Sequence, residues 1–372
     1  MEKVKLGDIC EVFSGFAFKT FNEDKQGKPV IKIGNIQIDG KISLEECSYT
    51  KEIPQEKYFS KVNDIYIALS GATTGKVGIM EQGDFLINQR VGVVRLKNNN
   101  IPINYLFSFL KSKTVTILQD AFGAAQPNIS PKDILNYEIP LPSLEEQKAI
   151  AGKLDKVSGL IEKRKTQLKK LDLLIKSRFI EMFGDPVSND KGWQHQAMDK
   201  VAPSSAGLGD NSETVWLLNL DMVEAQTGRI LDYLYVEKEQ VGTSTCAFDE
   251  GNVLYSKLRP YLNKVVVPTK KGYCTTELVP LRPNGKLNRQ FLAYLLRSEA
   301  FVSFINEKVA GAKMPRVSMS VFRDFECILP PIDLQNKFAT FVEQIDKSKF
   351  EIQKSLEKLE ILKKSLMQQY FG

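Results

Sequence analysis

Histidine and paired cysteine, on which metal and acid–base chemistry most often depend, are almost missing from this sequence. It contains one histidine, His195, and five cysteines, none of which forms a C-x-x-C pair. This pattern argues against a zinc site, a disulfide framework and serine or cysteine hydrolase chemistry, because no positioned partner base is evident. Unpaired cysteines favour a reducing cytosol, so we expect a cytoplasmic protein.

Long apolar runs and targeting segments are also lacking. No run approaches the ~18 apolar residues that a membrane span requires, and the residues after Met1 do not resemble a signal peptide. We therefore expect a protein without a membrane role.

Motifs that bind a nucleotide or a methyl donor are incomplete or missing. The segment Ser70-Gly-Ala-Thr-Thr-Gly-Lys76 superficially resembles a phosphate-binding loop, but Ser70 replaces the required first glycine and Val77 follows the lysine. A glycine-rich turn between strands is the simpler interpretation. The chain also has no Asn/Asp-Pro-Pro-aromatic signature. We therefore expect no catalytic residue, no cofactor and no metal in this chain.

What the sequence does contain is enough apolar material for several cores and a mild excess of positive charge. Of the 372 residues, 42% are hydrophobic, which permits two or three folded domains. The formal net charge of +6 permits a polyanionic partner, although many cytosolic proteins share such a balance.

The clearest feature is an internal repeat. Residues 123–184 recur without a gap as residues 311–372, and 17 of the 62 paired positions are identical at a constant offset of 188. Unrelated segments would agree at roughly one position in fifteen. Each copy follows a less similar globular half, so the chain is two copies of one unit, each with a variable part and a well-matched helix.

Both variable halves have the pattern of strand-rich α+β domains. β-branched runs bounded by glycine or asparagine predict buried strands. These runs are Val30–Gly34, Ile65–Leu69 and Val91–Leu96 in the first half, and Val215–Leu220, Val253–Ser256, Lys264–Val267 and Glu277–Leu281 in the second. Tyr105–Leu110 and Phe291–Leu296 are each apolar on one face, which predicts a matching short helix in each half.

The repeated segments predict two long helices, because apolar residues step by alternating four and three positions, as in a coiled-coil seam. The predicted seam comprises Leu154, Val157, Ile161, Leu168, Leu171 and Ile175 in the first helix, and Val342, Ile345, Ile352, Leu356, Leu359 and Leu366 in the second. A helix from Glu145 to Met182 would be about 57 Å long, which exceeds what a small domain needs for its own core.

Each seam has two charged breaks, at Arg164 and Arg178 in the first helix and at Lys349 and Lys363 in the second. The repeat pairs each break with an apolar residue of the other copy, so the breaks do not coincide. We expect the two helices to pair with each other as an antiparallel coiled coil. The alternative is that each packs along its own domain as an ordinary surface helix.

Further motifs accompany this layout. Asn63–Lys76 followed by Ile87–Val91 forms one pattern in the first half, and Gly251–Lys264 followed by Cys274–Glu277 forms another in the second. An L-P-x-L/I-E/D-x-Q segment leads into each helix, at Leu141–Gln147 and Leu329–Gln335. With these motifs the whole chain resembles the specificity subunit of a type I restriction-modification enzyme.

This resemblance implies an α+β fold with an internal pseudo-twofold repeat. The expected division is two similar target recognition domains, residues 1–143 and 185–331, each followed by a conserved spacer helix, residues 144–184 and 332–372. In the family, each recognition domain binds one half of a bipartite, asymmetric double-stranded DNA site, and the antiparallel helices fix the gap. The repeated segments hold two methyltransferase (modification) subunits.

The implied function is that of a non-catalytic DNA-recognition subunit in a type I restriction-modification complex. Methylation, and cleavage when motor-nuclease (restriction) subunits join, would be done by the partner subunits. Those partners would also bind the methyl donor, ATP and magnesium. The alternative function is a two-domain protein-binding scaffold without DNA recognition, and the chains that co-purify with the native protein would distinguish the two.

Polar and basic residues near the predicted turns are the candidates for DNA contact. Asn and Gln present the donor pattern that matches adenine, Arg and Lys match guanine, and small hydroxyl or basic groups on a turn suit phosphate. The candidates are Ser70, Thr73, Thr74, Lys76, Asn88, Gln89, Arg90, Gln126 and Asn128 in the first half, and Tyr255, Lys257, Arg259, Tyr261, Asn263, Lys264, Lys313 and Arg316 in the second. For each residue the alternative is a structural turn with solvated charges.

Overall fold

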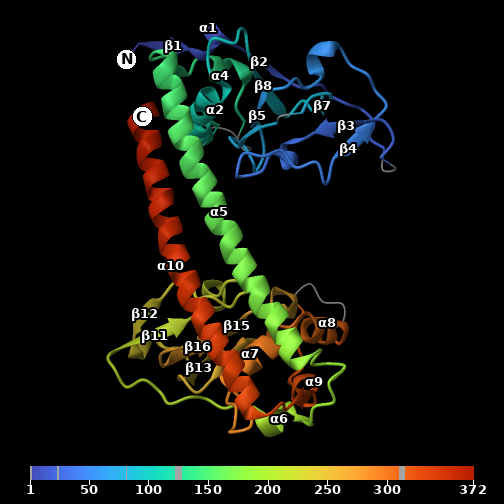
Figure 1. Ribbon diagram of the computed structural model, residues 1–372, viewed down its shortest axis with the longest axis vertical. Helices are drawn as coiled ribbons and strands as arrows, with labels where there is room; N and C mark the ends of the chain where they lie inside the picture. Colours follow the sequence, from blue (N-terminus) through green and yellow to red (C-terminus); the bar gives the residue numbers. More distant parts are fainter. Residues whose placement is uncertain (1, 23–24, 81, 122–127, 310–314) are drawn as a thin grey trace. The chain divides into compact units, whose positions relative to one another are not determined.

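The computed structural model describes residues 2–22, 25–80, 82–121, 128–309 and 315–372. The chain forms two compact units, the first from Met1–Lys165 with Lys354–Gly372 and the second from Thr166–Gln353 (Figure 1). Both mix helices with short strands, as the α+β prediction requires. Among the described residues, no helix combines the length and the apolar character that crossing a membrane requires.

The core of the first unit is built on two sheets, with strand orders β2-β8-β5-β6 and β4-β3-β7, while β1 pairs with β9. The strands are β1 Lys3–Lys5, β2 Cys10–Ser14, β3 Lys28–Ile31, β4 Ser48–Thr50, β5 Ile65–Ala68, β6 Val77–Ile79, β7 Leu86–Ile87, β8 Val91–Leu96 and β9 Glu138–Pro140. The helices are α1 Leu6–Ile9, α2 Ile103–Ser112, α3 Thr114–Ala121 and α4 Pro131–Leu135, with 3-10 turns at Ile33–Asn35 and Glu56–Tyr58.

Strand β5 is apolar at every position because both of its faces are covered. Ile65 and Ile67 lie in one hydrophobic cluster with Tyr105 and Phe109 of α2, whereas Tyr66 and Ala68 lie in a second cluster. Because side chains alternate along a strand, a strand with both faces covered must be apolar at every position.

The second unit repeats this plan with strand orders β12-β11-β16-β13 and β15-β14-β17, and with the pair β10-β18. The strands are β10 His195–Ala197, β11 Thr214–Leu218, β12 Leu234–Glu237, β13 Thr245–Phe248, β14 Val253–Ser256, β15 Val265–Val266, β16 Gly272–Thr275, β17 Leu278–Leu281 and β18 Glu326–Ile328. The helices are α6 Met198–Val201, α7 Arg289–Arg297, α8 Glu299–Glu307 and α9 Met319–Arg323, with 3-10 turns at Leu220–Met222, Lys238–Gln240 and Pro260–Leu262.

The repeat extends into the sheets beyond the segments that are similar in sequence. In the first unit β3 runs parallel to β7, with Ile31 opposite Ile87, and in the second β11 runs parallel to β16, with Leu218 opposite Cys274. The two pairs therefore occupy equivalent places in the two sheets. His195 begins β10, and its exposed ring contacts Glu326 across the β10-β18 pair.

The two long helices are α5, Leu144–Phe183, and α10, Ile332–Phe371, each of 40 residues. The motif that precedes them has a shared structural role, because a buried glutamine amide donates to the carbonyl of a proline that precedes the helix. Gln147 donates to Pro142 and Gln335 donates to Pro330, both at 2.8 Å. At α5, Ser143 and Glu146 add reciprocal capping bonds, which satisfy amides of the first helical turn.

In each unit α5 and α10 pack against each other in opposite directions. In the first unit Ile150 and Leu154 of α5 share a cluster with Phe371, while Lys165 lies 3.6 Å from Glu360. In the second unit Phe183 lies 5.5 Å from Phe338 between ring centroids. All the predicted seam residues are buried or half-buried.

The charge of Lys349, one of the breaks in the seam, is paired with Asp172, a residue outside the predicted seam. Lys349 Nζ lies 2.6 Å from Asp172 of α5 and 3.6 Å from Asp346 of its own helix. Burial disfavours the charge of Lys349, but the two carboxylates outweigh it and raise the pKa of this lysine. The break is therefore an ion-paired contact between the helices within the second unit.

Candidate nucleic-acid interface

The glycine-rich segment of the first unit is a tight turn between β5 and β6, as the sequence predicted. Gly71 and Gly75 have φ values of +84° and +82°, which glycine adopts most readily. The amide of Thr74 donates to the Gly71 carbonyl at 3.1 Å, and the amide of Ala68 donates to Lys76 at 2.9 Å. Ser70 forms an isolated antiparallel bridge with Asn128, which brings Asn128 beside the turn.

The second unit has the same turn between β14 and β15, although no glycine remains in it. Arg259 and Asn263 take the places of Gly71 and Gly75, and they have φ values of +49° and +51°. The amide of Leu262 donates to Arg259 at 2.9 Å, and the amide of Ser256 donates to Lys264 at 3.0 Å. Leu258 forms the matching bridge with Arg316.

A second turn lies beside each of these loops. The amide of Leu69 donates to the carbonyl of Arg90 at 2.9 Å, in the turn between β7 and β8. The amide of Lys257 donates equivalently to Glu277 at 3.0 Å, in the turn between β16 and β17. Arg90 thus occupies in the first unit the position that Glu277 occupies in the second.

We call these groups the first and second loop surfaces. The first comprises Ser70–Lys76, Asn88–Arg90 and Asn128, and the second comprises Lys257–Lys264, Glu277 and Arg316. On the first, Gln89, Arg90 and Asn128 are exposed, while Ser70, Lys76 and Asn88 are half-buried. On the second, Arg259, Tyr261 and Arg316 are exposed, and Lys257 is half-buried.

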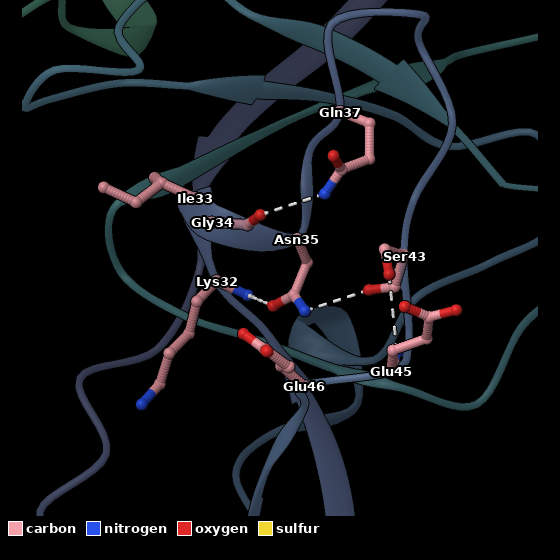
Figure 2. Close-up of a pocket in the computed structure, with 8 residues that line it drawn as sticks. All are labelled: Lys32, Ile33, Gly34, Asn35, Gln37, Ser43, Glu45 and Glu46. Carbon is pink, nitrogen blue, oxygen red and sulfur yellow. Dashed lines mark hydrogen bonds between the residues drawn. The ribbon is translucent and has the colours of Figure 1, made fainter. Parts of the chain in front are cut away.

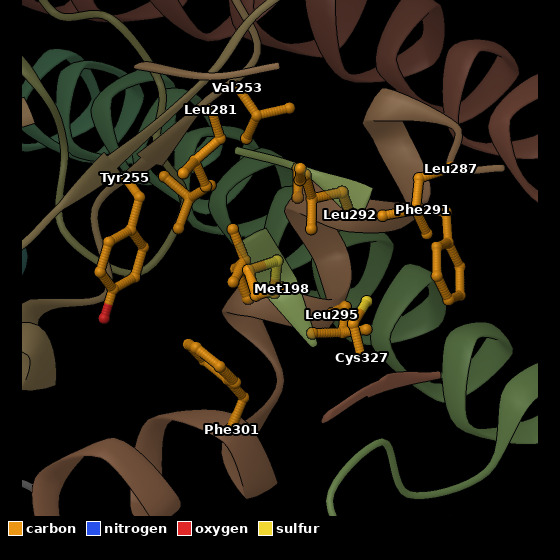
Figure 3. Packing of buried hydrophobic residues seen from close by; sticks show 14 of the residues in the cluster. Met198, Val253, Tyr255, Leu281, Leu287, Phe291, Leu292, Leu295, Phe301 and Cys327 are labelled. Carbon is orange, nitrogen blue, oxygen red and sulfur yellow. The ribbon is translucent and has the colours of Figure 1, made fainter. Parts of the chain in front are cut away.

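Several predicted contact residues instead support the fold. Tyr255 is 4% exposed and packs 4.7 Å from Phe322 between ring centroids, deep in the core that Figure 3 shows. The predicted DNA contact of Tyr255 is wrong because alternate residues of β14 face opposite sides of the sheet, and Tyr255 lies on the side that the helices cover.

The predicted contacts of two threonines in the first loop, and of two residues at the end of the second loop, are also corrected by the structure. The hydroxyl oxygens of Thr73 and Thr74 are enclosed, and Thr74 donates to Gly71 within its own turn at 2.7 Å. Asn263 is 6% exposed and donates to the Arg297 carbonyl at 3.0 Å. Lys264 donates to the Leu220 carbonyl at 2.8 Å, and partial burial lowers its pKa. Gln126 and Lys313 lie outside the described residues.

The predicted contact residues did not include Arg297 or Glu277, which hold the second loop surface in place. The buried guanidinium of Arg297 donates to the Val265 carbonyl, while the Arg297 carbonyl accepts from Asn263, so α7 fixes the start of β15. Glu277 Oε1 accepts from Arg316 Nη2 at 2.7 Å. Both residues bond to partners that are distant along the chain, where no local pattern reveals them.

A hollow of about 430 Å³ lies beside the 3-10 turn at Ile33–Asn35 in the first unit. The buried amide of Asn35 already has partners there, since it accepts from the Lys32 amide at 2.8 Å and donates to the Ser43 carbonyl at 2.9 Å (Figure 2). Among the described residues, no group of three or more His, Cys, Asp or Glu could hold a metal ion.

Comparison with known proteins places these loops in a family context. The family model described as the type I restriction modification DNA specificity domain matches residues 1–172 and 219–363. The type I restriction enzyme EcoDI specificity subunit of Escherichia coli is 24% identical over 283 residues, 66% of this chain and 63% of that subunit. The MjaVIII specificity subunit of Methanocaldococcus jannaschii is 22% identical over an alignment of 408 residues, 98% of this chain and 91% of that subunit.

Solved structures share the fold along the whole chain. The S subunit of a type I restriction-modification system from M. genitalium superposes with a TM-score of 0.60 at 16% identity, covering 100% of this chain and 96% of that one. A chain from a study of complex assembly and conformational transition of the type I R-M system superposes with a TM-score of 0.55 at 18% identity, covering 100% and 97%.

Proposed function

The chain belongs to the family of type I restriction modification DNA specificity domains, and from that membership we propose that each of its units reads one half of a bipartite DNA site. It is the DNA-recognition subunit of a type I restriction-modification system, a targeting chain and not the catalytic one. The proposed division is two target recognition domains, residues 1–143 and 185–331, with spacer helices at 144–184 and 332–372.

The observation that carries this proposal is the pair of loop surfaces. They share a backbone, down to the left-handed residues at Gly71 and Arg259, yet they present different polar groups. Arg90 and Asn128 of the first surface correspond to Glu277 and Arg316 of the second. Two domains that recognise different half-sites require a shared backbone that presents different polar side chains.

The exposed side chains divide by chemistry into positioning and reading groups. Lys76 and Lys257 are half-buried cations beside strand ends, where an ammonium group suits a phosphate. Gln89 and Asn128 carry amides that match adenine, whereas Arg90, Arg259 and Arg316 carry forks that match guanine. Ser70, Asn88 and Tyr261 complete the proposed contact set.

We assign the spacing of the half-sites to α5 and α10. The opposed packing at Ile150 and Phe371 in the first unit, and at Phe183 and Phe338 in the second, supports an antiparallel coiled coil along both helices. The half-buried seam residues between these contacts fit the same interpretation. Such a pair would hold the gap between half-sites constant.

Two equivalent apolar pairs on the helices are the proposed docking points for two copies of a methyltransferase subunit. Leu173 and Leu174 of α5 are 62% and 46% exposed, and Ile361 and Leu362, at the same places of the repeat in α10, are 69% and 46% exposed. Exposed aliphatic side chains of this size that recur at equivalent places suit a contact that is itself repeated. The motor-nuclease subunits would join the assembled complex, in a cytoplasmic setting.

The proposal assigns no cofactor to this chain. The methyl donor, ATP and magnesium would be bound by the partner subunits.

The proposed docking points predict how many methyltransferase copies bind. The changes Leu173→Asp with Leu174→Asp should remove one of two bound copies, and the corresponding changes in α10 should remove the other. The masses of the complexes in native mass spectrometry check this directly.

Selection from a randomised duplex library by the full chain, with its methyltransferase partner, tests the function itself. A DNA-recognition subunit with two readers should enrich a motif of two short specified parts separated by a gap of fixed length. Enrichment of no motif, together with co-purification of unrelated proteins, would favour the scaffold alternative instead.

A further inference from the structure

We propose that Glu277 is a positioning residue, which orients Arg316 to read a guanine in the half-site recognised by the second unit. The inference rests on the proposed function and assigns one base contact within it. It also adds a residue that is not among the contact candidates.

The two residues approach each other from different parts of the second loop surface. Glu277 lies in the turn between β16 and β17, and Arg316 lies on the segment that bridges Leu258. Backbone bonds fix that segment, since Val317 donates to Lys257 and Arg259 donates to Pro315, both at 2.8 Å. Arg316 Nη2 then donates to Glu277 Oε1 at 2.7 Å.

The burial of the pair is unequal. The side chain of Arg316 is 61% exposed, whereas that of Glu277 is 23% exposed. The second carboxylate oxygen of Glu277, Oε2, is enclosed and accepts no hydrogen bond from any described residue. An enclosed carboxylate oxygen without a partner is unfavourable for folding, so the bond to Arg316 is the interaction that the acid contributes at this position.

Arginine chemistry explains what such an acid does. The guanidinium has five N–H donors in a rigid fork, and one bond to a carboxylate restricts the rotation of that fork. Glu277 is the only described residue for which a bond to the Arg316 guanidinium is resolved, and most of that side chain faces solvent. A guanidinium that is held on one side by a half-buried carboxylate and is open on its other side suits the two acceptors on the major-groove edge of guanine.

The first unit provides the comparison. Its equivalent positions carry Arg90 and Asn128 in place of Glu277 and Arg316, so no acid is available to orient a fork there. Both residues are exposed. Within the described parts of the two loop surfaces, the acid–arginine pair therefore occurs on the second only, as a determinant of one half-site should.

The test compares the full chain with the variants Glu277→Gln, Arg316→Ala and the double variant. Each is used to select duplexes from a randomised library, and the enriched motif is read at every position. Glu277→Gln should lower the preference for guanine at one position of one half-site by about ten-fold. Arg316→Ala should abolish the preference there, and the double variant should match Arg316→Ala. The other half-site should be unchanged, which also shows that the chain is folded.

Glu326→Gln is the matched control, because it removes the charge of an acid that contacts His195 on the separate β10-β18 sheet of the same unit. It should leave both half-sites unaltered. Arg316→Lys is the second variant, because it keeps the charge and loses the fork. It should relax the same guanine position while the salt dependence of binding stays as in the wild type.

The outcomes separate this inference from the proposed function. If Glu277→Gln leaves every base preference intact, or weakens binding to all sequences equally, Glu277 does not orient a base reader. If Arg316→Ala changes only the salt dependence, Arg316 contacts a phosphate and the inference is overturned while the proposed function stands. If the wild-type chain enriches no motif, the proposed function itself has failed.

Discussion

Arg259 and Asn263 adopt a left-handed backbone conformation that glycine holds in the equivalent turn of the first unit. Asparagine tolerates this conformation well, whereas for a residue such as arginine it costs about 1–2 kcal/mol. Strain of this kind persists only where the surrounding structure holds it, and it clusters at functional sites. Gly71 shows that the same turn forms with glycine.

The change Arg259→Gly should therefore separate stability from binding. It should raise the free energy of unfolding of the second unit by up to about 1 kcal/mol, because the strain is removed. It should also weaken DNA binding, because an exposed cation of the loop surface is lost. Urea denaturation and binding titrations measure the two effects. Lower stability with unchanged binding would mean that the Arg259 side chain serves the fold.

In each unit an arginine pairs with a buried aspartate. Arg95 binds both oxygens of Asp64, at 2.7 and 2.6 Å, and the Asp64 side chain is 1% exposed. The second unit has a similar clamp, in which Arg282 binds Asp249. The hydrogen bonds that Arg95 donates to Asp64 raise the pKa of Arg95, so the guanidinium stays ionised.

The change Asp64→Ala should lower the free energy of unfolding of the first unit by about 3–5 kcal/mol, since it leaves the Arg95 charge half-buried and unpaired. The matched control is Lys28→Ala, which removes an exposed ion pair with Asp84 at 2.6 Å and should cost no more than about 1 kcal/mol. Equal losses in chemical denaturation of the two variants would contradict the structural role given to Asp64.

At the scale of elements, the sequence predicted the helices and strands whose hydrophobic residues recur with a regular period. The helices expected from Glu145 to Met182, and from the second copy of the repeat, are observed as Leu144–Phe183 and Ile332–Phe371. The run at Val91–Leu96 is β8 at the predicted residues. A hydrophobic period is a property of consecutive residues, and so it can be read without knowledge of the fold.

The candidate site was predicted less well, because long-range contacts decide which polar side chains remain accessible. Nothing local distinguishes Asn263, which bonds Arg297, from exposed Asn128. Lys264 and Lys257 differ in the same way, because Leu220 happens to lie within reach of one ammonium group. The contacts predicted for the remaining exposed residues stay predictions.

The spacer proposal predicts how the recognised gap responds to helix length. Seven residues inserted after Gly159 and seven after Lys347 preserve the heptad register and should lengthen the pair by about 10 Å, or ~3 base pairs. Gly159 is a suitable place, because nothing would meet an added side chain within 4 Å. Four residues inserted into α5 alone should break the register and weaken binding. An unchanged gap after the double insertion would contradict the proposal that the two helices set the spacing of the half-sites.

At the scale of the whole molecule, each unit is completed by a helix end from the other copy of the repeat. Phe371, the penultimate residue, lies 5.3 Å from Tyr105 and 5.8 Å from Phe109 between ring centroids, inside the core of the first unit. Its counterpart Phe183 lies 4.7 Å from Phe291 in the second unit. The shared Phe-Gly ends of the repeat thus have a packing role in both units.

This arrangement predicts that a change at the end of the chain destabilises the first unit. Phe371→Ala removes a ring that is 2% exposed and should cost about 3–5 kcal/mol. Hydrogen exchange should increase in α2, at Ile103–Ser112, while α7 in the second unit keeps its protection. Phe183→Ala should give the reverse pattern. Faster exchange in α7 alone after Phe371→Ala would contradict this account of the core.

The central claim, that each unit reads its own half-site, is tested most directly by changing one loop surface at a time. Selection from a randomised duplex library is performed with the wild-type chain, with Arg90→Ala and Asn128→Ala combined, and with Arg259→Ala and Arg316→Ala combined. The account predicts that the first pair of changes relaxes one part of the motif, that the second pair relaxes the other part, and that the gap is constant throughout. Loss of both parts with either pair, or of neither part with both, would contradict it.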